Sequence, residues 1–170
     1  MNIVLVGFMG TGKTTVAKLI AEKLSLLYVS TDEFIESAEL KSINEIFSEK
    51  GERYFRDVER KAVKEVSAKD GQVIDTGGGV ILSPENITDL KRNGIMVCLW
   101  ASPDVIYGRT AKFKHRPLLN VPDPKGRIKE ILKSREAFYD QADFHINTDK
   151  IKMDEAAEKI IEIYITRVGK

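Results

Sequence analysis

The chain of 170 residues carries 27 Lys and Arg against 26 Asp and Glu, a formal net charge of +1. With 42% hydrophobic and 31% charged residues, the composition is that of a globular protein rather than a disordered one, and the length suits one domain with its own core. The balanced charge gives no global field that would favour nucleic acid or a membrane surface as a partner.

The N-terminal apolar run is short and has no basic segment before it, so we expect neither a signal peptide nor a membrane-spanning helix. Cys98 is the only cysteine, which excludes an internal disulfide and a cysteine-based metal cluster. It lies in an apolar run, where a small core residue is the expected role. A single cysteine also fits a reducing, cytoplasmic setting.

The first predicted elements form a strand, a glycine-rich turn and a helix. An apolar strand at residues 3–6 precedes Gly-Phe-Met-Gly-Thr-Gly-Lys-Thr-Thr at residues 7–15, and apolar residues then recur at helical spacing as far as Leu24. The turn matches Gly-x-x-x-x-Gly-Lys-[Ser/Thr], the phosphate-binding P-loop. A glycine turn with a chance Lys-Thr would need neither the full spacing nor this strand and helix context.

The chemistry of a polyphosphate explains these residue types. Backbone N–H groups at a helix N-terminus converge on the phosphates, and glycines leave room for that approach. Lys13 can reach the outer phosphates, and the hydroxyl of Thr14 is an oxygen ligand suited to Mg²⁺. The predicted nucleotide-binding residues are Gly10, Thr11, Gly12, Lys13, Thr14 and Thr15.

A second strand at residues 26–29 ends at Ser-Thr-Asp, where Thr31 or Asp32 can cap a short helix through Ile35. Small helices are expected in the polar stretch up to residue 50, with Ser42 opening one and Gly51 ending it. A charged helix with an apolar stripe is predicted from about residue 52 to residue 69.

A very short strand at residues 73–75 is followed by three glycines, Gly77, Gly78 and Gly79. A flexible loop would explain the triplet, but its position directly after a strand favours a close contact with a ligand. A helix capped by Ser83 and stopped at Gly94 follows, then a buried strand at residues 95–100 and a helix that begins at Ser102-Pro103.

Residues 109–124 are rich in basic side chains, and the first carboxylate in the segment is that of Asp123. A solvated surface loop is one interpretation, and a lid that closes over a nucleotide is the other. The last elements are a helix at residues 126–139, a strand at 142–147 with His145 in a structural role, and an amphipathic helix at 153–168. Alternating strands and helices predict one α/β domain with a parallel sheet of about five strands.

Several motifs, taken in order and spacing, resemble the shikimate kinase family, which phosphorylates the 3-hydroxyl of shikimate with ATP. They are the P-loop, Thr-Asp-Glu-Phe-Ile-Glu at 31–36, Phe-Arg-Asp-Val-Glu at 55–59, Thr-Gly-Gly-Gly at 76–79, Arg-Pro-Leu-Leu at 116–119, and Arg135 four residues before Tyr139. The resemblance covers essentially the whole chain. It implies a three-layer P-loop kinase fold, with strand order 2-3-1-4-5 and helices on both faces of the sheet. A substrate-binding segment near residues 32–61 and a lid near 110–124 are also implied.

The resemblance also implies residue roles, ATP as co-substrate, Mg²⁺ as cofactor and shikimate as the small-molecule partner. Arg56 and Arg135 match positions that hold the substrate carboxylate, which suits the bidentate fork of a guanidinium. Asp32 matches the base that orients the acceptor hydroxyl, and Gly77, Gly78 and Gly79 match a substrate wall. From the lid, Arg116 would bring charge to the γ-phosphate, and Arg109 would pack on the adenine. We further expect a monomer.

One departure concerns the metal site. The family usually has Asp-x-Asp after the second strand, where the first carboxylate helps to hold Mg²⁺ through water, and this chain has Ser30 there. We predict that Asp75, at the end of the strand beside the P-loop strand, supplies that carboxylate near Thr14. The alternative is that Asp75 only caps the loop by accepting a backbone N–H from the glycines.

Two other functions remain open from the residues. Another small-molecule P-loop kinase, of the gluconate or nucleoside-monophosphate type, would share the architecture, although paired arginines favour an acceptor that carries a carboxylate. A P-loop ATPase or switch protein would need no acceptor pocket at all.

Overall fold

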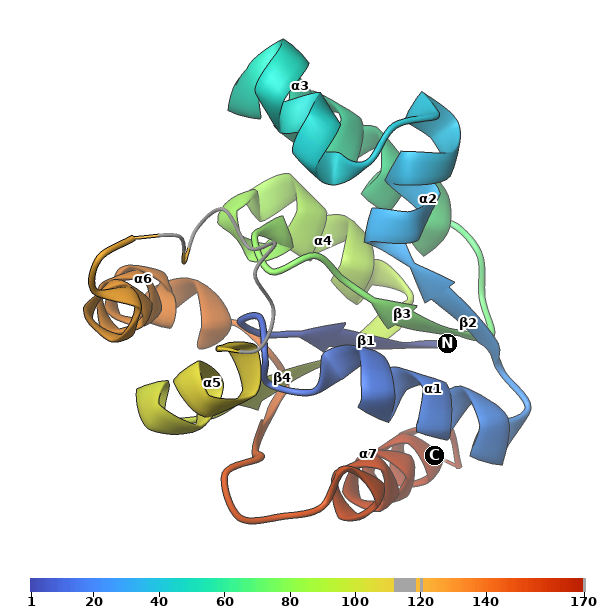
Figure 1. The fold of residues 1–170 in the computed structure, drawn as a ribbon. Coiled ribbons are helices and arrows are strands. Elements are labelled where there is room, and N and C mark those ends of the chain that lie inside the picture. The colour runs from blue at the N-terminus through green and yellow to red at the C-terminus, as the bar shows by residue number, and fades with distance from the viewer. Residues whose placement is uncertain (112–118, 120, 170) are drawn as a thin grey trace.

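The computed structural model describes residues 1–111, 119 and 121–169. Five strands form one parallel sheet in the order β2-β3-β1-β4-β5 (Figure 1), which confirms the implied strand order. The strands are β1 (Asn2–Val6), β2 (Leu27–Ser30), β3 (Gln72–Asp75), β4 (Gly94–Trp100) and β5 (Phe144–Asn147).

Helices cover both faces of this sheet. Alternate residues of β1 point to opposite sides, so Ile3 and Leu5 join one buried cluster while Val4 and Val6 join another. The first cluster packs against α1 (Lys13–Leu24) and α7 (Met153–Val168), and the second against α3 (Ile43–Ser67), α4 (Pro84–Arg92) and α6 (Pro124–Tyr139). The result is the predicted three-layer arrangement. Cys98 is buried in the second cluster, as expected.

The strand order fixes where a site can form. Ser30 and Leu5 both pair with Asp75, so β2, β3 and β1 end at the same edge of the sheet. The P-loop leaves β1 at this edge, α2 (Thr31–Glu39) leaves β2 there, and the three glycines leave β3 there. In an open parallel sheet, ligands bind in the crevice outside the carboxyl ends of the strands.

Several predicted boundaries were wrong by a few residues. Ser30, rather than Thr31 or Asp32, caps α2 by accepting the backbone N–H of Glu33, and the helix continues to Glu39 instead of ending at Ile35. Asp123 caps α6, which therefore starts at Pro124 rather than at Gly126. Residues 80–82 form a short 3-10 helix, η1 (Val80–Leu82).

The predicted break at Gly51 is present inside α3. Ser42 opens this helix, as predicted, and Glu45 completes a capping box with it. Gly51 has φ 78° and ψ 174°, so two helical segments meet there at a kink. The second segment, from residue 52 onward, is the charged helix that carries Arg56.

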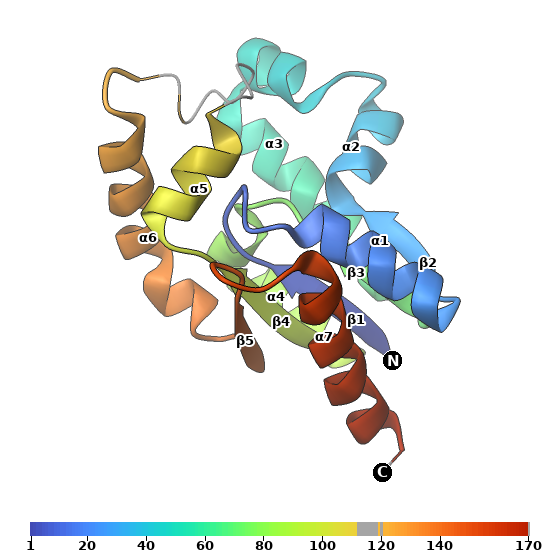
Figure 2. The ribbon, with the colours of Figure 1, turned by 60° about the horizontal axis from the view of Figure 1, so that its bottom comes forward.

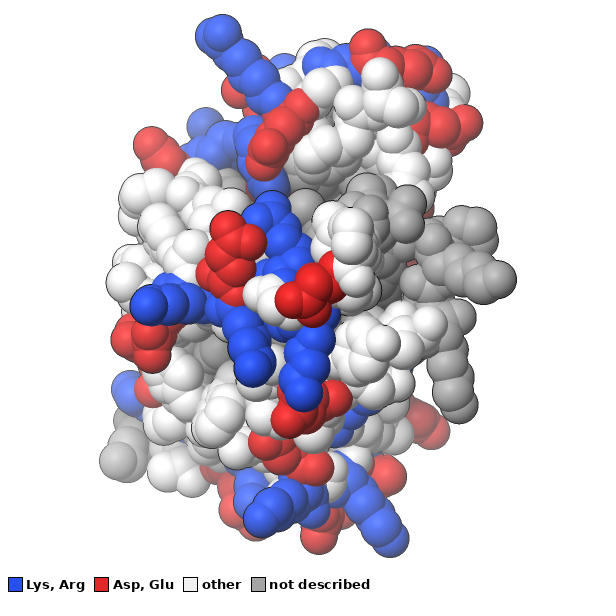
Figure 3. Space-filling view, turned by 60° about the vertical axis from the view of Figure 1, so that its left-hand side comes forward, with Lys and Arg blue, Asp and Glu red and all other residues white. Residues whose placement is uncertain are grey.

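The helix predicted to begin at Ser102-Pro103 is α5 (Pro103–Thr110), which lies beside α6 (Figure 1). On the face shown in Figure 3, basic and acidic side chains lie next to one another. Two ion pairs join residues of this region: Lys125 lies 2.5 Å from Asp104, and Arg127 lies 2.7 Å from Glu130. Most of the basic stretch, residues 112–118, lies outside the described residues. Within the described part of the chain, no helix is long and apolar enough to cross a membrane.

Candidate active site

The P-loop connects β1 to α1 and wraps around the side chain of Lys13. Gly10 and Gly12 have φ angles of 79° and 98°, in the left-handed region that glycine adopts at little cost. The ammonium of Lys13 donates to the carbonyls of Gly7 at 2.9 Å and Phe8 at 3.2 Å. These contacts hold the lysine across the loop, beside the N-terminus of α1, where backbone N–H groups favour an anion.

Asp75 lies beside the first turn of α1. The hydroxyl of Thr14 donates to Asp75 Oδ2 at 2.6 Å, and the hydroxyl of Tyr28 lies 3.3 Å from the same oxygen. Burial raises the pKa of Tyr28, and the charge of Asp75 raises it further, so Tyr28 remains a neutral donor. The N–H of Gly77, which the capping alternative would direct to Asp75, instead donates to Thr31 Oγ1 at 3.0 Å.

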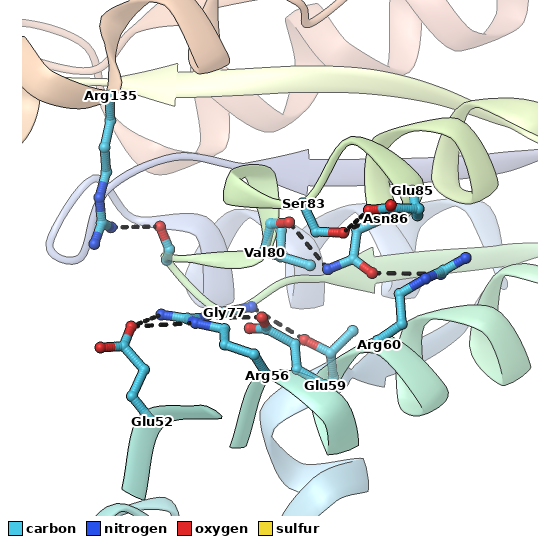
Figure 4. Close-up of polar contacts among 12 residues, drawn as sticks. Glu52, Arg56, Glu59, Arg60, Gly77, Val80, Ser83, Glu85, Asn86 and Arg135 are labelled. Carbon is cyan, nitrogen blue, oxygen red and sulfur yellow. Dashed lines mark hydrogen bonds and ion pairs between the residues drawn. The ribbon is translucent and has the colours of Figure 1, made fainter. Parts of the chain in front are cut away.

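The three glycines after β3 each meet one of the predicted acceptor-binding side chains. A Cβ built on Gly77 would lie 2.5 Å from Asp32 Oδ1, and one built on Gly79 would lie 2.6 Å from Arg56 Nη1. Between them, Arg135 Nη1 donates to the carbonyl of Gly78 at 2.9 Å (Figure 4). Any side chain larger than hydrogen at the two outer positions would displace a charged group.

Arg56 is held by two carboxylates from its own helix. Its guanidinium donates to Glu59 at 2.8 Å and to Glu52 at 3.1 Å (Figure 4). Glu59 is 2% exposed, whereas the side chain of Glu52 is 66% exposed. Burial raises the pKa of Glu59, and the positive charge of Arg56 opposes that rise.

Asp32 occupies an environment that changes its acidity. Burial raises the pKa of its carboxyl from 3.8 to about 6, with Lys13 opposing the shift and Glu59 adding to it. At neutral pH the carboxylate is therefore ionised but more basic than an exposed aspartate. A group with such a pKa can accept a proton from a positioned hydroxyl.

One cavity of about 660 Å³ brings the predicted nucleotide, metal and acceptor residues together. Its lining includes Gly10, Gly12, Lys13, Thr14, Thr15, Asp32, Arg56, Asp75, Gly77, Gly78, Gly79, Arg109 and Arg135. Thr11 is fully buried behind the loop, where its hydroxyl donates to the carbonyl of Phe8 at 2.8 Å. Arg116 lies outside the described residues, as does most of the predicted lid.

Comparisons with known proteins agree with this geometry. The family model for shikimate kinase matches residues 9–164. A shikimate kinase from Thermodesulfovibrio yellowstonii is 51% identical over 163 residues, which cover 96% of this chain and 94% of the relative. This chain belongs to the shikimate kinase family. A second family member, from Caldanaerobacter subterraneus subsp. tengcongensis, is 47% identical over 169 residues and is covered over 99% of both chains.

Solved structures of shikimate kinases have the same fold. The Acinetobacter baumannii shikimate kinase, in complex with shikimate, superposes with a TM-score of 0.92 at 35% identity, covering 98% of this chain and 93% of that one. The Aquifex aeolicus shikimate kinase gives a TM-score of 0.85 at 33% identity over the full length of both chains. As a member of the shikimate kinase family, this protein is an enzyme that uses ATP as a phosphoryl donor.

No role was predicted for three side chains that contact the predicted site residues, although one of them, Glu59, lies in the Phe-Arg-Asp-Val-Glu motif. Glu59 holds Arg56, Tyr28 contacts Asp75, and Thr148 contacts Arg109. The spacing of three residues between Arg56 and Glu59 on one helix was a usable signal for the first. The Tyr28–Asp75 and Thr148–Arg109 contacts join segments that are far apart in the sequence, so no local sequence pattern indicates them.

Proposed function

We propose that this member of the shikimate kinase family transfers the γ-phosphoryl group of ATP to the 3-hydroxyl of shikimate, with the residue roles given below. One observation carries the proposal. Each of the three glycines after β3 lies against one charged side chain, in the cavity that the P-loop lysine also lines. The pairs are Gly77 with Asp32, Gly78 with Arg135, and Gly79 with Arg56. A P-loop ATPase without an acceptor would have no use for that second set of charged groups.

Arg56 and Arg135 bind the carboxylate of shikimate in this proposal. Charge-assisted bonds from guanidinium groups are the strong ones, and a carboxylate accepts two at once. The exposed Glu52 now occupies one side of Arg56, and a substrate carboxylate can replace it without burying an unpaired charge. Glu59 is buried and keeps the guanidinium oriented during that exchange.

Asp32 accepts the proton of the attacking hydroxyl. The hydroxyl oxygen forms a bond to the γ-phosphorus while the bond from that phosphorus to the β,γ-bridging oxygen breaks, and ADP leaves with the electron pair. The proton moves to the carboxylate of Asp32, whose pKa of about 6 keeps it ionised at neutral pH and able to accept. Lys13 stabilises the charge that develops on the phosphate oxygens.

The residues at the end of β3 fit a magnesium ion. Thr14 donates its hydroxyl proton to Asp75, so the lone pairs of Thr14 Oγ1 remain available, and Asp75 Oδ1 can accept from a metal-bound water. Oxygen donors of this kind are those that Mg²⁺ prefers. Thr14 and Asp75 would hold the ion, which would supply positive charge to offset that of the phosphates. Ser30 lies opposite Asp75 in the sheet, so both positions face the same place.

Arg116 and Arg109 complete the proposed site. The positive charge that Arg116 brings to the γ-phosphate is inferred from the family resemblance, since this residue lies outside the described part of the chain. Arg109 lies at the end of α5 on the cavity wall, where its planar guanidinium can stack on the adenine.

The same proposal includes a cytoplasmic monomer with no nucleic-acid or membrane partner. The formal net charge of +1 and the interspersed basic and acidic side chains on the face in Figure 3 support the absence of a nucleic-acid or membrane partner. Size-exclusion chromatography with light scattering at working enzyme concentration tests the monomer directly, and a stable dimer mass would contradict it.

Release of ADP with and without shikimate tests the function. We expect rapid, Mg²⁺-dependent ADP formation only when ATP and shikimate are both present. Gluconate and nucleoside monophosphates serve as alternative acceptors, and equal ADP release without any acceptor would favour the slow ATPase. Arg92→Ala is a matched control for the arginine variants, because Arg92 is exposed on α4 and pairs with Asp89 away from the cavity.

A further inference from the structure

Thr148 lies between β5 and α7, and its side chain joins two parts of the nucleotide site. The segment from β5 to α7 passes beside the N-terminal end of α1 (Figure 2). Thr148 is fully buried, and its hydroxyl lies 3.0 Å from the guanidinium of Arg109 and 3.0 Å from the carbonyl of Thr11. A buried hydroxyl with partners on the P-loop and on α5 is a specific connection between the two.

The direction of each hydrogen bond follows from the groups involved. A guanidinium can only donate, so Thr148 Oγ1 accepts from Arg109 Nη1. The single hydroxyl proton of Thr148 is then available for the carbonyl of Thr11 at 3.0 Å, with the carbonyl of Trp100 at 3.3 Å as the more distant acceptor.

The carbonyl of Thr11 is important because of the peptide unit to which it belongs. In a trans peptide the C=O and the N–H point in opposite directions, so holding the carbonyl of Thr11 against Thr148 turns the N–H of Gly12 away from Thr148. Gly12 lines the cavity and caps α1. Its N–H is one of the backbone donors that a P-loop directs at phosphate.

Arg109 is fixed by the same contacts. Its edge donates to the carbonyl of Thr148 at 2.6 Å, to the hydroxyl of Thr148 at 3.0 Å and to the carbonyl of Gly10 at 3.2 Å. A guanidinium bonded along its edge keeps its two faces open, and those faces are what stack on a ring. The threonine therefore sets the plane of Arg109 relative to the phosphate loop.

We propose that Thr148 is a positioning residue for the nucleotide, acting on the phosphates through Thr11 and on the base through Arg109. This inference rests on the proposed function, which identifies the nucleotide as ATP or its product ADP. It assigns to the buried hydroxyl of Thr148 a link between the P-loop and Arg109 that none of the sequence motifs suggests.

Thr148→Val tests the proposal because valine keeps the shape and removes the hydroxyl. We expect ADP to bind roughly tenfold more weakly, since one neutral hydrogen bond and one to a charged group are lost. Thr148→Ser keeps the hydroxyl and should recover most of the affinity. Isothermal titration calorimetry with ADP, well below the melting temperature of each variant, provides a readout that does not depend on turnover.

Competition by inorganic tripolyphosphate separates the effect on the phosphates, through Thr11, from the effect on the base, through Arg109. This ligand has phosphates but no base. We expect its affinity to fall in Thr148→Val by a smaller factor than that of ADP. The KM for shikimate should stay unchanged while the KM for ATP rises. Thr166→Val is the matched control, because Thr166 is exposed on α7 and its hydroxyl only donates to the carbonyl of Glu162.

Unchanged ADP affinity in Thr148→Val would overturn the proposal, even if the melting temperature fell. An equal loss for ADP and shikimate would also overturn it, because that pattern belongs to a general distortion of the cavity. Absence of acceptor-dependent kinase activity in the wild type would instead contradict the proposed function, and the ADP titration would still stand as a separate result.

Discussion

Replacing Asp75 by asparagine should raise the Mg²⁺ concentration that nucleotide binding requires. The structure gives the magnitude, because the substitution removes the charge from a hydrogen bond of 2.6 Å between Thr14 and Asp75. A hydrogen bond to a charged group is worth about 1.5–3 kcal/mol, or roughly 10- to 100-fold in affinity. Mutation of the outer-shell partners of metal ligands lowers metal affinity or activity in the same range, roughly 10- to 100-fold.

The rescue variant is Asp75→Asn/Ser30→Asp, which moves the carboxylate across the β2–β3 pair. Ser30 and Asp75 are direct partners in the sheet register, and aspartate at position 30 can still cap α2 as the serine does. We expect the double variant to recover most of the lost Mg²⁺ affinity. Tyr28→Phe, which removes only the 3.3 Å contact to Asp75, should give a smaller effect.

Calorimetry of ADP binding at a series of Mg²⁺ concentrations measures the effect without turnover, and Mn²⁺ electron paramagnetic resonance gives an independent view of the ion. The steady-state Mg²⁺ requirement at fixed ATP and shikimate then shows whether the same shift appears in catalysis. An unchanged half-saturating Mg²⁺ concentration in Asp75→Asn would refute the reasoning and leave Asp75 with a structural role.

Arg56→Ala and Arg135→Ala should each weaken shikimate binding roughly 10- to 100-fold in calorimetry, with ADP affinity preserved, because each removes a charge-assisted contact. Arg116→Ala should lower kcat more than shikimate affinity, and an intact kcat would mean that its role is misassigned. Asp32→Asn should abolish acceptor-dependent turnover, and in the wild type kcat/KM should fall as the pH drops below about 6, where Asp32 becomes protonated. Because burial raises the folded-state pKa of Asp32 from 3.8 to about 6, its ionisation begins to lower stability as the pH rises past 3.8 and has its full cost above about pH 6. Asp32→Asn is therefore expected to raise the free energy of unfolding in urea by about 3 kcal/mol near pH 8, and by less than about 1 kcal/mol near pH 4.

Local patterns predicted the parts of the site that depend on neighbours in the chain. The P-loop needs a strand, a fixed glycine spacing and a helix, and all three lie within residues 3–24, so the sequence was sufficient. The break at Gly51 and the helix start at Ser42 are equally local. The strand order came from the family resemblance, since alternating strands and helices leave the order of the sheet open.

Contacts between distant segments could not be predicted in the same way. Thr11 and Thr148 are 137 positions apart in the chain. A threonine in a loop gives no sequence signal that its hydroxyl connects a phosphate loop to an arginine. The cap of α2 shows a subtler case, because Ser30, Thr31 and Asp32 are all good capping residues. The sheet decides among them: Ser30 still pairs with Asp75 and keeps an extended backbone, which leaves the carboxylate of Asp32 for the cavity.

The segment from Asp75 to Gly79 connects the proposed metal site to the proposed acceptor site. Asp75 ends β3 beside Thr14, and the glycines that follow lie against the side chains proposed to bind the acceptor. Thr76 ties the segment to the P-loop strand, because its N–H and its hydroxyl both donate to the carbonyl of Leu5, at 3.2 and 2.8 Å. In-line transfer needs the acceptor hydroxyl and the γ-phosphate at a fixed separation, and small misplacements are costly in rate. If the proposed roles hold, five consecutive residues anchored to β1 set that separation through the backbone, and the short spacing between Asp75 and the glycines keeps it fixed.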